Sequence, residues 1–187
     1  PFCPSSQGAF IDLIRGLWVS SSGDKVWCRQ IQRVVNRKYI SRLMTYDFEK
    51  KSHFLYQYEH QHFITSVLVS EAFELAMSGG DDKALVLHDL KSGKMIKRFD
   101  MKYGDLQCLF DLGTAVAVGD RNIIRFLDPE TREMKNFEVK AGGHLSFCMS
   151  LGTAGSGQND SMALLVGGGG MSKMDKISIP KVIARLG

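Results

Sequence analysis

The sequence predicts an all-β fold made of repeated, four-stranded antiparallel sheets. Three dipeptides that end at Asp47, Asp89 and Asp128 each close an alternating apolar segment and lead into a polar turn. They recur about every forty residues, which is the period of a β-propeller blade. Nineteen glycines against four prolines suit a chain with many tight turns. We therefore expect propeller blades, forming a partial propeller of about three to four blades.

The first part of the chain departs most from this plan. Residues 1–13 are expected to form an N-terminal extension, and residues 14–62 an irregular first blade. In that blade, "LIRGLWVS" and "VWCRQIQ" flank the turn "SSGDK", which predicts a hairpin. The segment "RVVNRKYI" is expected to be an extended connection before the strands "RLMTYDF" and "HFLYQYEH". A helix over residues 30–44 is the alternative.

The clearest repeat spans residues 63–102. It reads as the strands "ITSVLVS", "ELAMS", "ALVLHDL" and "KMIKRFDM", joined by Gly-containing turns. Residues 103–143 repeat the plan, with Pro129 in a turn where the missing N–H does no harm. Residues 144–187 are expected to form a final, divergent blade. Its first two strands flank a long loop, "GTAGSGQNDS", and "KISIPKVIARLG" reads as a further pair of strands.

The segment "SGGDDKALVLHDLKSGK" resembles the blade motif of the WD-repeat family. The matching positions are Ser78, Gly79, Asp82, Val86, Asp89 and Gly93, and His88 stands where the family usually has tryptophan. In such blades a buried hydrogen-bonded chain fixes the geometry, because buried polar groups must be satisfied. The resemblance covers roughly residues 40–170. It implies a structural network of His62, Ser78, Asp82, His88 and Asp89.

An open stack of blades leaves an apolar face at each end. We therefore expect the chain to be part of a larger propeller, with the missing blades supplied by the rest of the polypeptide or by another chain. A self-closed ring of four blades is the alternative. The start of the chain lacks a signal-peptide pattern, and no long apolar run predicts a membrane span. An intracellular, cytoplasmic protein is expected.

Several segments invite a catalytic or metal-binding interpretation. The run from Gly167 to Lys173 lies in a Gly-rich turn, but it matches neither the P-loop nor the dinucleotide pattern. His60 and His62 lack a third ligand beside them, and no cysteine pair has zinc spacing. Asp120 and the pair at residues 81–82 are expected to cap turns. The sequence thus predicts no enzyme, no cofactor and no metal, with a nucleotide-using enzyme as the third alternative.

Basic residues gather where the turns between second and third strands, and the connections between blades, should meet one rim. These residues are Arg33, Arg37, Lys38, Lys83, Arg121, Lys140 and Lys173. With a net charge of +4 the chain is mildly basic, which falls short of a dedicated nucleic-acid binder. We expect a non-catalytic scaffold or adaptor that binds protein partners within a larger complex. RNA or ribonucleoprotein binding through this rim is the alternative.

Overall fold

The fold is all-β, as predicted. The computed structural model describes residues 17–34, 38–102, 106–112, 115–143, 145, 147–153, 161–167 and 175–180, and in these ranges the only regular elements are strands. The strands form four antiparallel sheets, three with four strands and one with three, and each sheet follows the order of the chain. No part of the described chain is a helix of the length and apolarity needed to cross a membrane.

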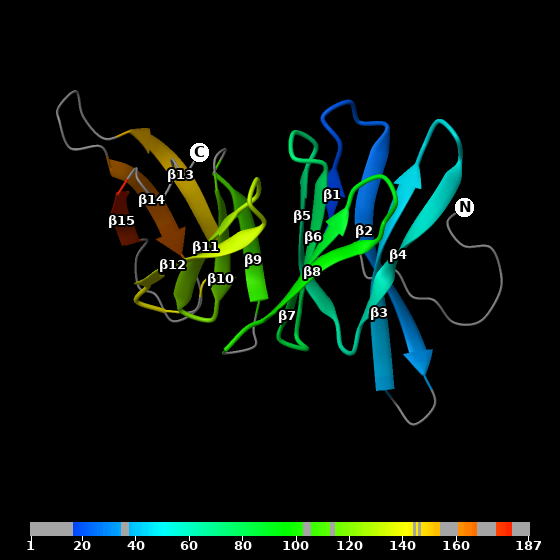
Figure 1. Cartoon of the computed structure of the whole chain (residues 1–187), viewed down its shortest axis with the longest axis horizontal. Coiled ribbons are helices and arrows are strands. Elements are labelled where there is room, and N and C mark those ends of the chain that lie inside the picture. Colours follow the sequence, from blue (N-terminus) through cyan, green and yellow to red (C-terminus); the bar gives the residue numbers. More distant parts are fainter. Residues whose placement is uncertain are drawn as a thin grey trace.

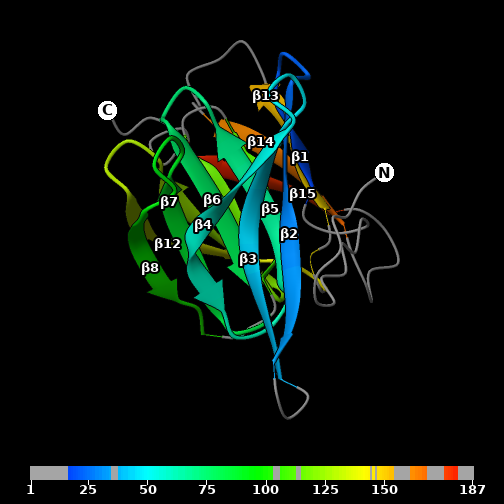
Figure 2. The same ribbon diagram turned by 90° about the vertical axis from the view of Figure 1, so that its right-hand side faces the viewer.

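The first sheet consists of β1 (Trp18–Val19), β2 (Lys25–Val34), β3 (Lys38–Asp47) and β4 (Ser52–His60). β2 and β3 pair along their whole length, and β1 meets β2 only at Val26 and Trp27. The last pair between β3 and β4 joins Ser41 to His60. The distal end of the β2–β3 hairpin therefore projects past the neighbouring strands (Figures 1 and 2).

This hairpin corrects the expectation for the first blade. The extended connection predicted at "RVVNRKYI" is instead the end of β2 and the start of β3, and the alternative helix over residues 30–44 is wrong. Arg33 pairs with Tyr39 and Val34 with Lys38, so the strands continue almost to the tip. Alternating β-branched and aromatic residues on both sides of a short turn favour a ribbon over a loop.

The second and third sheets share one plan. The second holds β5 (Ile64–Ser70), β6 (Leu75–Gly80), β7 (Ala84–Asp89) and β8 (Met95–Asp100). The third holds β9 (Leu106–Asp111), β10 (Val116–Asp120), β11 (Ile123–Asp128) and β12 (Glu133–Lys140). In both, the two middle strands are almost wholly buried and the last strand alternates between exposed and half-buried residues. Central strands covered on both faces read as apolar runs for this reason.

The fourth sheet holds β13 (Phe147–Thr153), β14 (Ser161–Gly167) and β15 (Asp175–Pro180). The ends of the predicted loop "GTAGSGQNDS" belong to β13 and β14, and its residues 154–160 lie outside the described residues. The second strand expected after Pro180 also lies outside them. The four sheets stand one after another along the molecule (Figure 1). The described sheets are consistent with propeller blades, and they do not close into a ring.

Three aspartates of the repeat occupy the same place in three sheets. Asp47, Asp89 and Asp128 each end the third strand, and each accepts a hydrogen bond from the backbone N–H three residues later. These bonds measure 2.9, 2.7 and 3.1 Å. In each turn the residue four positions after the aspartate has a positive φ: Lys51 (49°), Gly93 (64°) and Arg132 (59°). The repeat seen in the sequence is thus a repeat of turn geometry.

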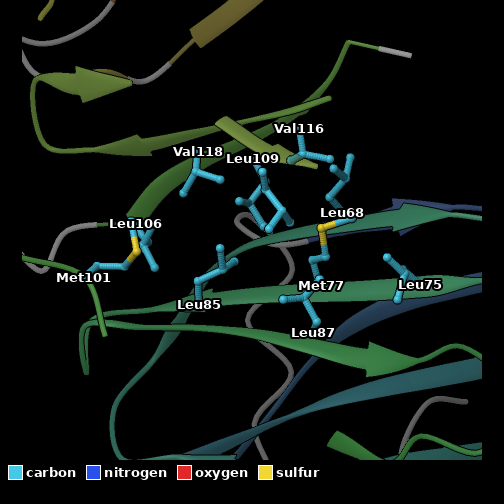
Figure 3. Close-up of a cluster of buried hydrophobic side chains, with 11 residues drawn as sticks. Leu68, Leu75, Met77, Leu85, Leu87, Met101, Leu106, Leu109, Val116 and Val118 are labelled. Carbon is cyan, nitrogen blue, oxygen red and sulfur yellow. The ribbon is translucent and has the colours of Figure 1, made fainter. Parts of the chain in front are cut away.

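Three buried clusters join the described sheets in series, and one of them brings Phe126 of the third sheet together with Val166 of the fourth. The largest lies between the second and third sheets, where Leu85 and Leu87 of β7 face Val116 and Val118 of β10 (Figure 3). Another lies between the first and second sheets and includes Trp27. Each sheet therefore covers the flank of the sheet before it, which supplies most of the apolar burial.

Candidate functional site

A buried chain of polar side chains crosses the boundary between the first and second sheets. His60, the last residue of β4, points Nδ1 at Asp82 Oδ1 (3.0 Å) and Nε2 at Ser78 Oγ (2.8 Å). Ser78 Oγ also lies 3.0 Å from Nε2 of His88 on β7. His60, Ser78 and His88 are fully buried. The chain therefore links the exit of the first sheet to two strands and a turn of the second.

Hydrogen bonds fix the charge of Asp82, which lies in the β6–β7 turn. Burial alone would raise its pKa, but His60 and the backbone N–H groups of Gln61 and Ala84 hold the pKa of this carboxyl below its ordinary value. An ionised Asp82 requires a proton on His60 Nδ1, so in the neutral imidazole Nε2 is an acceptor. Ser78 then donates to His60 and accepts from His88 Nε2–H.

His88 is the member of this chain with an unsatisfied buried nitrogen. With its proton on Nε2, its buried Nδ1 has no hydrogen-bond partner. Burial, and secondarily the charge of His60, lowers the pKa of His88 from 6.5 to about 3. The ring stands edge-on to Tyr56, with centroids 5.2 Å apart. The Tyr56 hydroxyl in turn accepts a bond from Trp27 Nε1 (3.0 Å) and donates to the Leu90 carbonyl (3.1 Å).

Asp82, His60 and Ser78 are linked in the order found in serine hydrolases, although their spacing in the sequence carried no such signal. The nucleophile of a hydrolase must reach its substrate, and here Ser78 and His60 have no exposed surface at all. A second imidazole also occupies the other side of the Ser78 hydroxyl. The arrangement therefore suits a structural role, as the resemblance implied for Ser78, Asp82 and His88.

Two residues of the expected network lie elsewhere. His62 is exposed, and only its backbone carbonyl is engaged, by the Ser41 hydroxyl. His60 takes the predicted place because β4 runs to residue 60 and carries that ring into the sheet boundary. Asp89 caps its turn through Ser92 and does not contact the buried chain. The Ser92 hydroxyl and backbone N–H hold the pKa of Asp89 below its ordinary value.

Gly80 is a residue of this site that the sequence analysis did not single out. A Cβ at position 80 would lie 2.6 Å from His60 Nδ1 and 2.7 Å from Asp82 Oδ1. Both distances are shorter than any ordinary contact, so a side chain here would push His60 and Asp82 apart. The doublet Gly79-Gly80 in front of two aspartates is the available signal in the sequence.

The rim residues come together in part. Alternate turns of an up-and-down sheet lie at opposite ends, so the β6–β7 and β10–β11 turns share one rim with the distal β2–β3 hairpin (Figure 1). Lys83 and Arg121 sit in these turns with φ of 64° and 61°. Lys140 reaches the same rim, since it pairs with Ile123 just after the turn. Arg33 and Lys38 lie at the distal end of the hairpin. Arg37 and Lys173 lie outside the described residues.

The hairpin concentrates positive charge. Between Asp24 and Asp47 the sequence has no carboxylate, and it contains Lys25, Arg29, Arg33, Arg37, Lys38 and Arg42. Near the base, Arg29 is buried: it donates to the Ile64 carbonyl (2.8 Å) and lies over the Phe63 ring. Arg42 pairs with Glu59. Arg33 and Lys38 lie toward the tip, on the rim of Lys83 and Arg121, whereas Lys25 lies at the opposite end of the hairpin and pairs with Asp24.

The opposite rim holds a cavity of about 530 Å³ between the first and second sheets. Trp27, Leu90 and Phe54 supply its apolar lining, and acidic and basic side chains surround them in similar number. Asp24 is held by the hydroxyls of Ser22 and Ser20, which lower its pKa to about 2. In the described part of the chain, no group of three His, Cys, Asp or Glu residues is placed to hold a metal ion.

Comparisons with known proteins place the fold. No family model matches the chain, and no curated protein matches it in sequence. Among solved structures, it is similar to the computationally designed protein Ika4, with a TM-score of 0.65, 11% identity and 94% of both chains covered. It is also similar to Sqt1 of Saccharomyces cerevisiae, a WD-repeat protein, with a TM-score of 0.65 and 12% identity.

That second alignment covers 88% of this chain and 45% of Sqt1, so the chain spans less than half of the yeast protein. At these identities the likeness concerns the fold alone. The antiparallel four-stranded sheets and the likeness to Sqt1 are compatible with a WD-type propeller.

Proposed function

We propose that this chain is a non-catalytic scaffold that binds protein partners within a larger assembly. The observation that carries the proposal is the rim on which the β6–β7 and β10–β11 turns present Lys83 and Arg121 in the same backbone conformation. The hydrogen-bonded Ser78–His60–Asp82 constellation is sealed from solvent, so its serine has no access to a substrate.

The two turns are held rigidly. The carbonyl of Lys83 accepts a bond from the N–H of Met101 (2.7 Å), and the carbonyl of Arg121 accepts one from Leu145 (2.7 Å). Each turn is thereby tied to the connection that leaves its own sheet. A surface fixed in this way loses little conformational entropy when a partner binds, which suits a platform for several proteins. The likeness to a WD-repeat fold supports the same role.

The proposal extends to the setting of the protein. The sheets do not close into a ring, so we expect further blades from the rest of the polypeptide or from another chain to complete the propeller. We expect the assembly to work in the cytoplasm. The mass of the intact polypeptide, measured together with the proteins that co-purify with it, tests whether the further blades belong to the same chain.

Charge reversal on the rim is the direct test. The full chain carrying Lys83→Glu and Arg121→Glu should lose a defined set of co-purifying proteins, measured by quantitative mass spectrometry. The matched control is Lys91→Glu with Arg132→Glu, because these residues lie in the β7–β8 and β11–β12 turns at the opposite rim. Identical partner sets for the wild type and the rim variant would rule out this rim as the docking surface.

RNA binding is the second candidate, and the hairpin favours it. A stretch without carboxylates from Lys25 to Tyr46 would attract a phosphate backbone, and such binding weakens steeply as salt rises. The probe is a single-stranded oligouridine, titrated into the full chain at several salt concentrations. Binding that is steeply salt-dependent and is lost on Lys83→Glu with Arg121→Glu supports this candidate. No binding at low salt eliminates it and leaves the protein scaffold.

A further inference from the structure

The buried chain between the first and second sheets has only one proton arrangement in which every donor has an acceptor. In that arrangement His60 Nδ1–H donates to Asp82, Ser78 donates to His60, and His88 Nε2–H donates to Ser78. The sole unsatisfied atom is the lone pair of His88 Nδ1. Buried N–H and O–H groups without an acceptor are rare, because each retains the full cost of its lost hydration.

Any added proton destroys this arrangement. A proton on His88 must sit on Nδ1, where no acceptor is available. A proton on His60 turns its Nε2 into a donor toward Ser78, so the Ser78 hydroxyl must turn to His88 Nε2 and the proton of His88 must move to Nδ1. If His88 keeps its proton on Nε2 instead, the Ser78 hydroxyl faces two donors and has no acceptor itself. Every protonated state therefore buries a donor without a partner.

The groups around His88 belong to both sheets. Tyr56 and His60 reach it from β4 of the first sheet, and Ser78 faces it from β6 of the second. Asp82 lies behind His60, and Asp89 follows His88 on the same strand. His88 has no exposed surface while the two sheets are packed together. Separating the sheets removes Tyr56 and His60, exposes His88 to water and permits it to take up a proton.

We propose that the junction between the first and second sheets is an acid-sensitive latch, in which a proton taken up by the His60–Ser78–His88 chain releases the first sheet from the second. The buried histidines of the described residues are His60 and His88, and both lie at this boundary, whereas the Thr65 and Ser66 hydroxyls that reach the Leu106 carbonyl of the third sheet do not titrate in this range. Acid therefore acts on one boundary of the fold. The rim that combines the β2–β3 hairpin with the β6–β7 turn loses its fixed geometry when the latch opens.

Linkage gives the size of the effect. A histidine with a pKa of 6.5 when exposed and about 3 when buried has almost no effect on opening well above pH 6.5, where it is neutral in both states, and favours opening progressively below that pH. At about pH 5 the opening equilibrium should have risen about thirtyfold relative to pH 7.5. Carboxylates titrate at lower pH, so the window between about pH 7.5 and 5 isolates the imidazoles.

Intrinsic fluorescence can observe the latch directly. The chain has two tryptophans, and both lie in the first sheet, with Trp27 buried against the second. We expect the emission of the full chain to shift to longer wavelength as the pH falls from about 7.5 to 5, while the far-ultraviolet circular dichroism of the strands persists. Simultaneous loss of both signals, or no fluorescence change in this range, would overturn the proposal.

The variant His88→Phe removes the titrating group and keeps an aromatic ring against Tyr56. Its fluorescence transition should move below about pH 5. His53→Phe is the matched control, since His53 is exposed on β4 of the first sheet, and this variant should show the same fluorescence transition as the wild type. An unchanged transition in His88→Phe overturns the proposal. If that variant lacks native circular dichroism at neutral pH, His88→Gln serves instead, because its amide donates to Ser78 and does not titrate.

Hydrogen exchange supplies an independent readout. After correction for the intrinsic pH dependence of exchange, peptides from β4, β6 and β7 should lose about thirtyfold protection at about pH 5. Peptides from β10 and β11 should keep theirs. Equal loss in both groups means that acid unfolds the whole domain, which contradicts a latch at a single boundary.

Discussion

The two boundaries that flank the second sheet solve the same packing problem with different chemistry. Toward the third sheet, Val118 and Leu127 present apolar side chains, and both are fully buried. Toward the first sheet, the corresponding places in β6 and β7 hold Ser78 and His88, as the strand pairings show. The fold tolerates either choice. The boundary with the third sheet gains mainly from apolar burial, with hydroxyl bonds from Thr65 and Ser66 to the Leu106 carbonyl. The boundary with the first sheet adds to its own apolar cluster a buried polar chain whose hydrogen bonds must all be made.

This difference teaches what each boundary is sensitive to. The stability of an apolar boundary depends on the volume of its side chains, because removing a methyl group leaves a cavity. A polar boundary responds to geometry and to protons, since one displaced or protonated group leaves others unsatisfied. The first boundary is therefore the place where conditions can act on the fold, and the second is the constant part of the scaffold.

The largest expected effect is at the apolar boundary. Leu87→Ala removes a fully buried side chain from the cluster between the second and third sheets. It should lower the free energy of unfolding by about 3 kcal/mol, within the range of about 2–5 kcal/mol for such truncations. Chemical denaturation at neutral pH measures it. A loss below about 1 kcal/mol would show that this cluster is not a packed core.

Gly80→Ala should break the polar boundary without removing any of its hydrogen-bonding groups. The new Cβ would displace His60 or Asp82 from the other, and we expect a loss of about 2 kcal/mol in unfolding free energy. Gly23→Ala is the control for a loop glycine, because no atom lies within 4 Å of its added Cβ. Full stability in Gly80→Ala would mean that the chain has room to rearrange.

His88→Leu makes the first boundary resemble the second, where Leu127 stands at the corresponding place. At about pH 7.5 we expect a change within about 1 kcal/mol, because one unsatisfied nitrogen is exchanged for apolar burial. At about pH 5 the variant should be more stable than the wild type by about 2 kcal/mol, since the folded wild type excludes the proton that its unfolded chain binds. Urea denaturation at both pH values tests the sign. Equal acid sensitivity in the two proteins would assign the effect to other groups.

The smallest effect concerns a turn conformation that occurs in both the second and the third sheet. Lys83 and Arg121 both hold a positive φ, which costs a residue with a side chain more than it costs glycine. Lys83→Gly and Arg121→Gly should each raise the melting temperature slightly, by the equivalent of about 0.5–1 kcal/mol. Lys91→Gly has no such conformation to relieve and should not stabilise the protein. Unequal gains at Lys83 and Arg121 would show that the turns differ.

Much of the fold could be predicted from local signals. The aspartates at 47, 89 and 128 marked the repeat because each has to satisfy the backbone of the turn that follows it. The pattern of apolar and polar residues predicted β5 to β12, because the burial of one or both faces of a strand determines which residue types it can contain. The first sheet was harder. The predicted connection is part of a long hairpin instead. β2 and β3 pair with each other beyond the ends of β1 and β4, so the length of the hairpin does not depend on those two strands.

The sequence by itself determined the strands, the turns and the repeat, because these depend on neighbours within a few residues. Only the tertiary structure decided that His60, and not His62, meets Ser78, that Gly80 must lack a side chain, and that His88 is left with an unpaired nitrogen. Those outcomes depend on how two sheets approach each other. Hydrogen bonds between residues far apart in the chain are set by tertiary packing, which no local pattern encodes.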